Sequence, residues 1–372
     1  MDIQPFELER YFAKYEFSSR YLLSSSDCDG LPMSQVLSYA DDETKALWDN
    51  LTLGYTESQG LPLLRREIAA LYRDISPEQV LEAMPEEGIF LAMNAILRPG
   101  DHVICAIPGY QSLYQVAESI GCALTGWQPD ESQGWRFAPD VLRESITPAT
   151  KLIVVNFPHN PTGYLPSQQD YAEIVDIARE HSLYLFSDEM YRLLEYDDTD
   201  RLPSAVELYE CAVSLFGMSK TFGMAGVRTG WVVTRDAHLL RKMATLKDYT
   251  TICPPAPSEI LTLIGLRAKD GIIAGNLAKI RKNLTLLDAF FARHSHLFSW
   301  VRPRAGTIAF VRLLGEESAS GFCRRVVEEA GIMLMPSSVY GYGDKHVRIG
   351  FGRGSLAEVL GVLEEYLGRR GR

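Results

Sequence analysis

Cysteine and histidine are both scarce in this sequence, and neither forms a pattern that binds a metal or builds a disulfide framework. Six cysteines are scattered through 372 residues without a C-x-x-C pair, so we expect reduced thiols, mostly in the core. His294 and His296 could share a metal, but no third ligand lies near them in the sequence, which favours an ordinary surface pair.

Long apolar runs and an excess of positive charge are also missing. No stretch approaches the roughly 18 apolar residues that span a bilayer, and residues 1–14 carry charges throughout, unlike a signal peptide. A cytoplasmic protein without membrane contact is expected. The formal net charge is -11, with 37 Lys and Arg against 48 Asp and Glu. Nucleic acid is not an expected partner, because affinity for phosphate backbones comes from clustered basic residues.

Common motifs for nucleotide binding and hydrolysis are absent as well. The sequence contains no G-x-x-x-x-G-K-[ST], no H-E-x-x-H and no G-x-S-x-G. The glycines Gly350, Gly352 and Gly354 miss the G-x-G-x-x-G spacing of dinucleotide-binding folds. These absences leave P-loop, zinc-protease and α/β-hydrolase functions without support.

The pattern that is present indicates an α/β fold. Apolar runs typical of strands buried on both faces occur at residues 102–107, 151–156, 183–187, 213–216 and 231–234. Segments 62–72 and 171–181 have the spacing of amphipathic helices, and the second lies between two strands as a crossover helix should. Alternation of this kind predicts a mainly parallel sheet covered by helices.

Four polar segments each follow a predicted strand, the place where open α/β sheets bind ligands. They are Asn156–Gly163 (NFPHNPTG), Ser187–Tyr191 (SDEMY), Ser219–Arg228 (SKTFGMAGVR) and Val347–Gly352 (VRIGFG). Taken singly, each has an ordinary structural interpretation: a turn, a helix cap, a solvated lysine and a surface ion pair. Their order along one chain is far more specific than any of them alone.

With these four segments in this order, the chain resembles fold-type I pyridoxal-phosphate enzymes of the aspartate-aminotransferase-like superfamily, classes I and II. The resemblance extends from about Leu51 to Gly352. It implies pyridoxal 5'-phosphate as cofactor and a large domain with a mainly parallel, seven-stranded sheet. We expect that domain at residues 45–265, and a smaller α+β domain made by residues 1–44 and 266–372.

The resemblance also implies roles for the residues nearest the cofactor ring. Lys220 would form the Schiff base with the cofactor and move the substrate's proton, and Asp188 would pair with the pyridine nitrogen. Asn160 and Tyr191 would donate to the cofactor's phenolic oxygen. Asn160 would also contact the substrate, and Asp188 and Tyr191 count with Lys220 as catalytic residues.

Further roles follow for residues around the phosphate and the substrate. Arg228 and Ser219 would bind the phosphate, and Tyr110 would stack on the ring. Arg348 would hold the substrate's α-carboxylate as a bidentate fork. Tyr55 matches a tyrosine that reaches the phosphate of the neighbouring subunit, which implies a homodimer with shared active sites.

The chain departs from the family pattern at three places. Gly217 stands where the family has a phosphate-binding Ser or Thr, and Ser219 could partly substitute for it. The family's second phosphate cradle corresponds to Met84–Ile89, where Glu86 and Glu87 are the candidate cofactor-binding residues. The N-terminal loop Leu23–Cys28 lacks the family's glycine near the substrate.

Five further residues are candidates for a place near the substrate's side chain: Tyr15, Arg20, Ser25, Asp27 and Arg353. Each of them is also of a type that is common at protein surfaces. The segment 258–287 is expected to be helical with interruptions at Gly265, Gly271 and Gly275, and the change of domain is placed there.

The function expected from this resemblance is transamination between an L-amino acid and a 2-oxo acid in a ping-pong cycle. Elimination, cyclisation or oxidation of an amino acid on the same site is the main alternative. A third possibility is a ligand sensor of this fold, but such regulators carry a DNA-binding domain, and the roughly 50 residues upstream of the resemblance hold no basic recognition helix.

Overall fold

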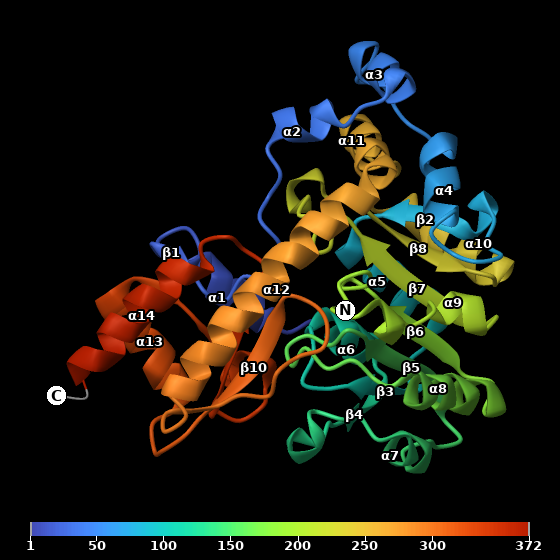
Figure 1. Ribbon diagram of the computed structural model, residues 1–372. Coiled ribbons are helices and arrows are strands. Elements are labelled where there is room, and N and C mark those ends of the chain that lie inside the picture. The colour runs from blue at the N-terminus through green and yellow to red at the C-terminus, as the bar shows by residue number, and fades with distance from the viewer. Residues whose placement is uncertain (1, 371–372) are drawn as a thin grey trace.

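The computed structural model describes residues 2–370 and contains the predicted large sheet (Figure 1). Its seven strands lie side by side in the order β2 (Val80–Ala83), β8 (Gly230–Thr234), β7 (Ala212–Gly217), β6 (Tyr184–Asp188), β5 (Thr150–Asn156), β3 (His102–Ala106) and β4 (Ala123–Trp127). Strand β8 runs antiparallel to both of its neighbours, and the other pairs are parallel. The predicted fold class is confirmed.

Helices cover both faces of this sheet because its central strands are apolar on both sides. Leu152 and Val154 of β5 pack on one face, and Ile153 and Val155 on the other. The first face is covered by α5 (Pro85–Ile96), α6 (Ser112–Ile120) and α10 (Ala237–Lys247). The second is covered by α7 (Pro139–Glu144), α8 (Gln168–Glu180) and α9 (Ala205–Leu208), with α4 (Pro62–Ala69) and α11 (Ala256–Arg267) toward the β2 edge.

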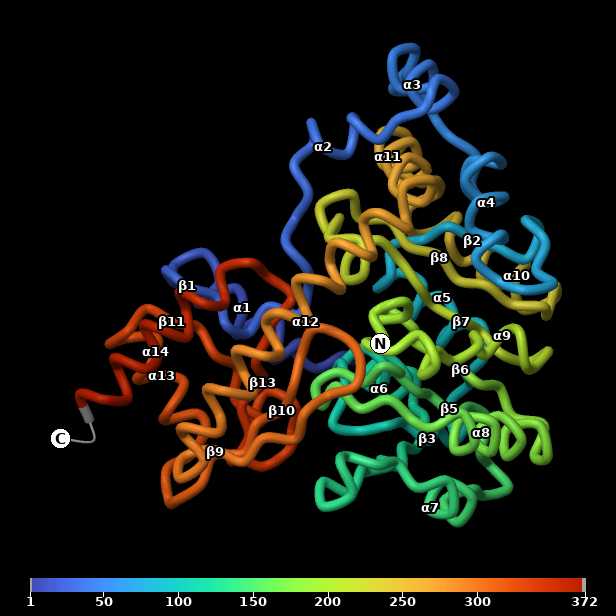
Figure 2. Tube along the Cα trace, viewed as in Figure 1, coloured from blue at the N-terminus to red at the C-terminus, as the bar shows by residue number. Residues whose placement is uncertain are grey.

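A second, antiparallel sheet lies beside the large one, in the order β12 (Met335–Pro336), β13 (His346–Gly350), β10 (Ile308–Leu313) and β9 (Phe298–Ser299). Around it lie α13 (Ala319–Ala330), α14 (Leu356–Arg370) and the N-terminal α1 (Glu7–Tyr15). Strand β1 (Tyr21–Leu22) pairs with β11 (Ile332–Met333). The N-terminal segment therefore packs with the C-terminal hundred residues of the chain (Figure 2). The chain then passes through α2 (Met33–Ser38) and α3 (Asp42–Asp49) to the large sheet.

Short 3₁₀ turns complete the list of elements: η1 (Pro77–Gln79), η2 (Glu131–Gln133), η3 (Asp198–Asp200), η4 (Ala225–Val227) and η5 (Ser337–Tyr340). All six cysteines are free, and three of them are buried. Within residues 2–370, no helix is long and apolar enough to cross a membrane, and no three or more His, Cys, Asp or Glu side chains gather where they could hold a metal.

The predicted glycine interruptions are wrong. Helix α12 (Lys269–Arg293) runs for 25 residues straight through Gly271 and Gly275, and the break with α11 comes at Ala268. Gly in a helix costs about 1 kcal/mol relative to Ala, which the buried apolar face of α12 offsets. The predicted domain limits, 44/45 and 265/266, fall within α3 and α11 and stay a prediction. Helix α12 itself spans from the large sheet to the smaller one (Figure 1).

Candidate active site

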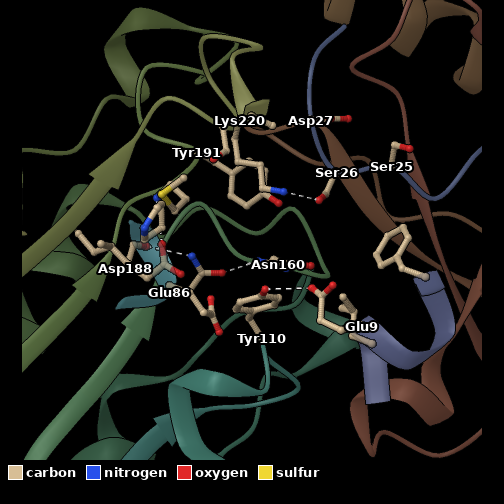
Figure 3. A pocket seen from close by; sticks show the side chains of 18 of the residues that line it. Glu9, Ser25, Ser26, Asp27, Glu86, Tyr110, Asn160, Asp188, Tyr191 and Lys220 are labelled. Atoms are coloured by element: carbon tan, nitrogen blue, oxygen red, sulfur yellow. Dashed lines mark hydrogen bonds between the residues drawn. The ribbon is translucent and has the colours of Figure 1, made fainter. Parts of the chain in front are cut away.

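A cavity of about 400 Å³ lies at the carboxyl ends of β5, β6 and β7, closed on the other side by the N-terminal segment. The predicted site residues that line it are Glu86, Tyr110, Asn160, Asp188, Tyr191, Ser219, Lys220, Arg228 and Arg348. Figure 3 shows most of them around one space, with Ser26 facing Lys220. Two predicted residues, Tyr55 and Glu87, do not line it.

The turn after β5 is tied to the end of β6. Asn156 lies opposite Asp188 in the parallel ladder, and its Nδ2 donates to the Asp188 carbonyl at 2.9 Å. Its Oδ1 accepts from the backbone N–H of Asn160 at 2.9 Å. Asn156 therefore fixes the turn at Asn160 against the end of β6 at Asp188. Its place in the sequence motif did not reveal this role.

Asp188 is a buried carboxylate on the cavity wall. The residue is 5% exposed, and its Oδ1 accepts from the backbone N–H of Met190 at 3.0 Å. Burial raises the pKa of Asp188 to about 7, while the Met190 hydrogen bond and the positive charge of Lys220 oppose that rise. A cation placed against this carboxylate would stabilise its ionised form.

Lys220 follows β7 and points into the cavity from the opposite side. Its Nζ donates to the Ser26 hydroxyl at 2.8 Å. Burial lowers the pKa of Lys220, and the nearby carboxylate of Asp27 opposes that change. An amine whose pKa is lowered is more often uncharged, which is the form that attacks a carbonyl carbon.

Arg348 is buried on β13, with only 1% of the residue exposed. Its Nη1 donates to the Tyr340 hydroxyl at 2.6 Å and to Asn160 Oδ1 at 3.2 Å, and its Nη2 donates to the Ser24 carbonyl at 2.7 Å. Within residues 2–370, no carboxylate lies within ion-pair distance of this guanidinium, and its Nε has no hydrogen-bond partner. A buried, unneutralised guanidinium is suited to an anionic ligand.

Two tyrosines face the cavity from different elements. The Tyr110 hydroxyl donates to Glu9 Oε1 at 3.2 Å, and its ring lies 5.0 Å from that of Phe6, centroid to centroid. The Tyr191 hydroxyl is buried, and burial raises its pKa, which the charge of Arg348 opposes. Tyr191 is thus a neutral hydrogen-bond donor at physiological pH.

Gly217, one of the departures at the predicted phosphate end, is closely surrounded by backbone and by Pro85. A Cβ on Gly217 would lie 2.9 Å from Gly230 Cα, 3.0 Å from the Thr229 carbonyl oxygen and 3.3 Å from Pro85 Cγ. The Pro85 ring, which begins α5, also occupies the space that a side chain on Gly230 would need. A Ser or Thr at 217 would therefore press mainly on the backbone of Gly230 and Thr229, and less closely on the Pro85 ring.

Arg228 and Ser219 remain as polar groups at this end of the cavity. Arg228 is exposed, has a left-handed φ of 54°, and donates through Nη1 to the Ala225 carbonyl at 3.1 Å. Glu86 turns into the cavity, where burial raises its pKa. Glu87 turns away and accepts from the hydroxyl groups of Thr250 and Thr251.

Tyr55 lies outside the cavity of its own chain, and the residue is 91% exposed. Its loop is held by a hydrogen bond from the Thr56 hydroxyl to the Pro254 carbonyl at 2.8 Å. Leu53 and Tyr249 are almost as exposed, at 86% and 87%. The role of Tyr55 in a neighbouring subunit stays a prediction.

The N-terminal segment supplies cavity residues that sequence reasoning missed. Glu9, Phe12 and Glu16 line the cavity with the i, i+3, i+7 spacing of one helix face, a signal that was readable in the sequence. Of the five side-chain candidates, Ser25, Asp27 and Arg353 line the cavity, while Tyr15 and Arg20 do not.

Together these groups could hold a ring that carries both a carbonyl and a basic nitrogen. A buried amine, a buried carboxylate and a free guanidinium converge on one cavity, and the unpartnered Arg348 Nε fits an incoming carboxylate. The fold and the site thus define an α/β enzyme of the pyridoxal-phosphate type. The chain belongs to the aminotransferase class I and II family, whose model matches residues 20–365. This membership confirms the predicted family and its cofactor, pyridoxal phosphate.

Individual relatives and solved structures agree with this assignment. The chain is 30% identical over 369 residues to a capreomycidine synthase of Streptomyces vinaceus, covering 95% of this chain and 92% of that protein. It is 26% identical over 326 residues to an aspartate aminotransferase of Pyrococcus horikoshii, covering 84% and 83%. A PLP-dependent aminotransferase from Streptococcus suis superposes with a TM-score of 0.92 at 28% identity over 99% of both chains. A PLP-dependent cyclase superposes with a TM-score of 0.90 at 27% identity, covering 100% and 98%.

Proposed function

We propose that this protein is an aminotransferase that moves an amino group from an L-amino acid to a 2-oxo acid in a ping-pong cycle. The observation that carries the proposal is the convergence of Lys220, Asp188 and Arg348 on one buried cavity. These three groups can respectively bond a carbonyl carbon, hold a proton on a ring nitrogen and bind a carboxylate.

Each residue has a task that follows from its surroundings. Bound pyridoxal phosphate supplies an electron sink for the charge that forms when the substrate's Cα loses a proton. Asp188, buried and anionic once a cation faces it, would keep the ring nitrogen protonated. Lys220, whose pKa burial lowers, would hold the cofactor covalently and then carry the Cα proton as a general base.

The substrate is oriented by the opposite wall. Arg348 would bind the α-carboxylate through its guanidinium, which Tyr340 and the Ser24 carbonyl hold in place. Asn160 and Tyr191 would donate to the cofactor's phenolic oxygen, and Arg228 with Ser219 would bind the phosphate at the exposed end.

The decisive experiment follows the nitrogen atom. The loaded enzyme is incubated with a ¹⁵N-labelled L-amino acid and an unlabelled 2-oxo acid, and the products are analysed by mass spectrometry. We expect equal amounts of a new ¹⁵N-amino acid and of the donor's oxo acid. Release of labelled ammonia, without any labelled amino acid, would exclude transamination as the main reaction.

A cyclisation or elimination on the same site is the second candidate. It is favoured by the similarity over nearly the whole chain to a protein named as a capreomycidine synthase and to a solved PLP-dependent cyclase. Such a reaction retains or releases the nitrogen and needs no 2-oxo acid. Product formation in the absence of any oxo acid, beyond one equivalent of enzyme, would identify it.

We further propose a homodimer with shared sites, because Leu53, Tyr55 and Tyr249 are large side chains that are almost fully exposed and that a partner could cover. Subunit mixing tests this idea. If Tyr55 serves the neighbouring subunit, Lys220→Ala and Tyr55→Ala subunits are each impaired alone, but a mixed dimer regains one complete site. A mixture that stays as inactive as its parts contradicts shared sites, and light scattering measures the oligomeric state directly.

A further inference from the structure

One wall of the active-site cavity carries acidic groups that the proposed reaction does not use. Glu9 and Phe12 lie on α1, and Glu16 is the residue that ends this helix. Their spacing places all three on the face that lines the cavity. Figure 3 shows Glu9 extending from α1 toward Tyr110, with Ser25 and Ser26 across the space.

The basic groups of the cavity already have other tasks or partners. Arg353 is paired with Asp27, with Nε and Nη2 at 3.0 and 3.1 Å from the two carboxylate oxygens. Arg348 faces the proposed carboxylate site. Within residues 2–370, no Lys, Arg or His nitrogen lies within 4.0 Å of the Glu9 or Glu16 carboxylate. The wall therefore carries two negative charges without a neutralising partner at contact distance.

Burial makes this arrangement costly unless a cation arrives. Both carboxylates are partly buried, and burial raises the pKa of Glu16. The charge of Arg353 and, less strongly, that of Lys220 oppose this rise, while the charges of Asp27 and Glu9 add to it. Neighbouring carboxylates in a partly dry cavity repel each other and lose hydration. A positively charged ligand would remove both penalties.

A second, independent feature also points to a hydrogen-bonding ligand. Ser25 is 6% exposed, lines the same cavity, and its hydroxyl has no hydrogen-bond partner among the described residues. Buried hydroxyl groups are rarely left unpaired in folded proteins. An N–H of a bound ligand could supply the missing partner.

The wall also lies where a substrate side chain would extend. The Arg348 Cζ lies 5.8 Å from the centre of the Phe12 ring, so α1 borders the proposed carboxylate site. An amino acid held by Arg348 would thus direct its side chain along Phe12, between Glu9 and Glu16. An aromatic face next to two carboxylates is a favourable surface for a flat cation.

We propose that the substrate of this enzyme carries a positively charged side chain, an ammonium or preferably a guanidinium, bound between Glu9 and Glu16 against Phe12. This inference rests on the proposed function, because it places the substrate's carboxylate at Arg348. A guanidinium fits better than an ammonium because its planar fork can donate to both carboxylates while its face covers the aromatic ring.

Two matched pairs of amino acids test the proposal with the cofactor-loaded enzyme. L-Arginine is compared with L-citrulline, which has nearly the same shape but no charge, and L-lysine is compared with L-norleucine. Binding is measured by calorimetry and nitrogen transfer by mass spectrometry. We expect the charged member of each pair to bind at least about tenfold more tightly, as is typical when a charged hydrogen bond is lost.

Variants of the two glutamates test whether the preference for a charged side chain arises at this wall. Glu16→Gln and Glu9→Gln should each reduce the arginine-to-citrulline binding ratio by about tenfold. Glu7→Gln on the same helix is the control, since Glu7 is exposed and does not line the cavity, and it should leave the ratio unchanged. Among the described residues, the Glu16 carboxylate has no hydrogen bond or ion pair that Glu16→Gln would remove. This variant therefore decides the outcome if Glu9→Gln, which disturbs the hydrogen bond from Tyr110, is unstable.

The outcomes separate this proposal from the proposed function. Equal binding of both members of each pair overturns the cationic substrate, whether or not nitrogen transfer to an oxo acid is seen with other amino acids. Tight, Glu16-dependent binding of arginine without any nitrogen transfer supports the binding site and contradicts transamination. A charge preference that survives in both glutamine variants also overturns the proposal, because the selectivity would then arise elsewhere.

Discussion

The Arg348 guanidinium donates to the Tyr340 hydroxyl at 2.6 Å, and both groups reach Oδ1 of Asn160 at 3.2 Å. Strand β13, the turn η5 and the turn after β5 thus meet at one oxygen atom. Arg348, which is proposed to bind the carboxylate, and Asn160, which is proposed to contact the cofactor, are therefore linked by hydrogen bonds. A change at either residue should affect the position of the other.

Tyr340→Phe should weaken substrate binding while leaving the fold intact. The phenol bridges Arg348 and Asn160, and without it the guanidinium loses one of its three acceptors. A lost hydrogen bond to a charged group costs about 1.5–3 kcal/mol. We expect KM for the donor amino acid to rise about tenfold, with a smaller change in kcat, in steady-state assays. An unchanged KM would show that the bridge does not position Arg348.

Lys220→Ala should abolish covalent attachment of pyridoxal phosphate. Lys220 is the lysine among the described residues that line the cavity, and its buried amine is the available nucleophile. Borohydride treatment followed by mass spectrometry should show the cofactor fixed to wild type and absent from the variant. Lys282→Ala, an exposed change on α12, serves as the control and should retain the adduct. A fixed cofactor on another lysine would refute the assignment.

Asp188→Asn should change the pH dependence of stability in cofactor-free protein. Burial raises the pKa of Asp188 from 3.8 to about 7, so the folded chain retains a proton that the unfolded chain releases. This group's stabilising contribution is complete below about pH 4 and is lost as pH rises through about 7. Asparagine does not titrate, so the variant should gain roughly 2–3 kcal/mol relative to wild type between about pH 5 and pH 8.

Urea denaturation of both proteins at each pH measures this difference, and other titrating groups cancel in the comparison. Glu86 and Lys220 are the neighbouring charges whose effects on Asp188 oppose each other. Saturation with pyridoxal phosphate should reduce the difference, because a cationic ring nitrogen would keep the carboxylate ionised. Parallel stability curves for the two proteins would show that Asp188 is not protonated in the folded state.

Gly350→Ala should destabilise the protein by roughly 3 kcal/mol, at the upper end of typical overpacking effects. Its Cβ would lie 1.7 Å from the backbone oxygen of Ser25, so strand β13 would have to move away from the loop that accepts from Arg348. Gly361→Ala is the matched control: it is exposed on α14 with open space around it, and it should stabilise by about 0.5–1 kcal/mol. Thermal unfolding of both variants checks the pair, and equal effects would contradict the contact.

The sequence alone determined the sheet and the residues at its edge. Buried apolar runs are typical of central strands, and polar residues directly after parallel strands lie at one carboxyl edge. The run 231–234 is the exception, because β8 is antiparallel to its neighbours. Asn160, Asp188 and Lys220 could therefore be predicted to lie together from local patterns, and the structure brings them to one cavity. Their chemical roles came from the resemblance of the ordered motifs to a family.

Only the tertiary structure decided which distant segments complete the cavity. Arg348 meets a carbonyl 324 positions earlier in the sequence, and Tyr110 meets a glutamate 101 positions earlier, through packing that no local pattern encodes. The fit of Pro85 against Gly217, and the passage of α12 through two glycines, are likewise settled by neighbours. Local sequence sets backbone preferences of about 1 kcal/mol each, whereas contacts between remote segments exist only after the whole core has formed. The helical spacing of Glu9, Phe12 and Glu16 was readable in the sequence, but only the folded chain places this face against the cavity.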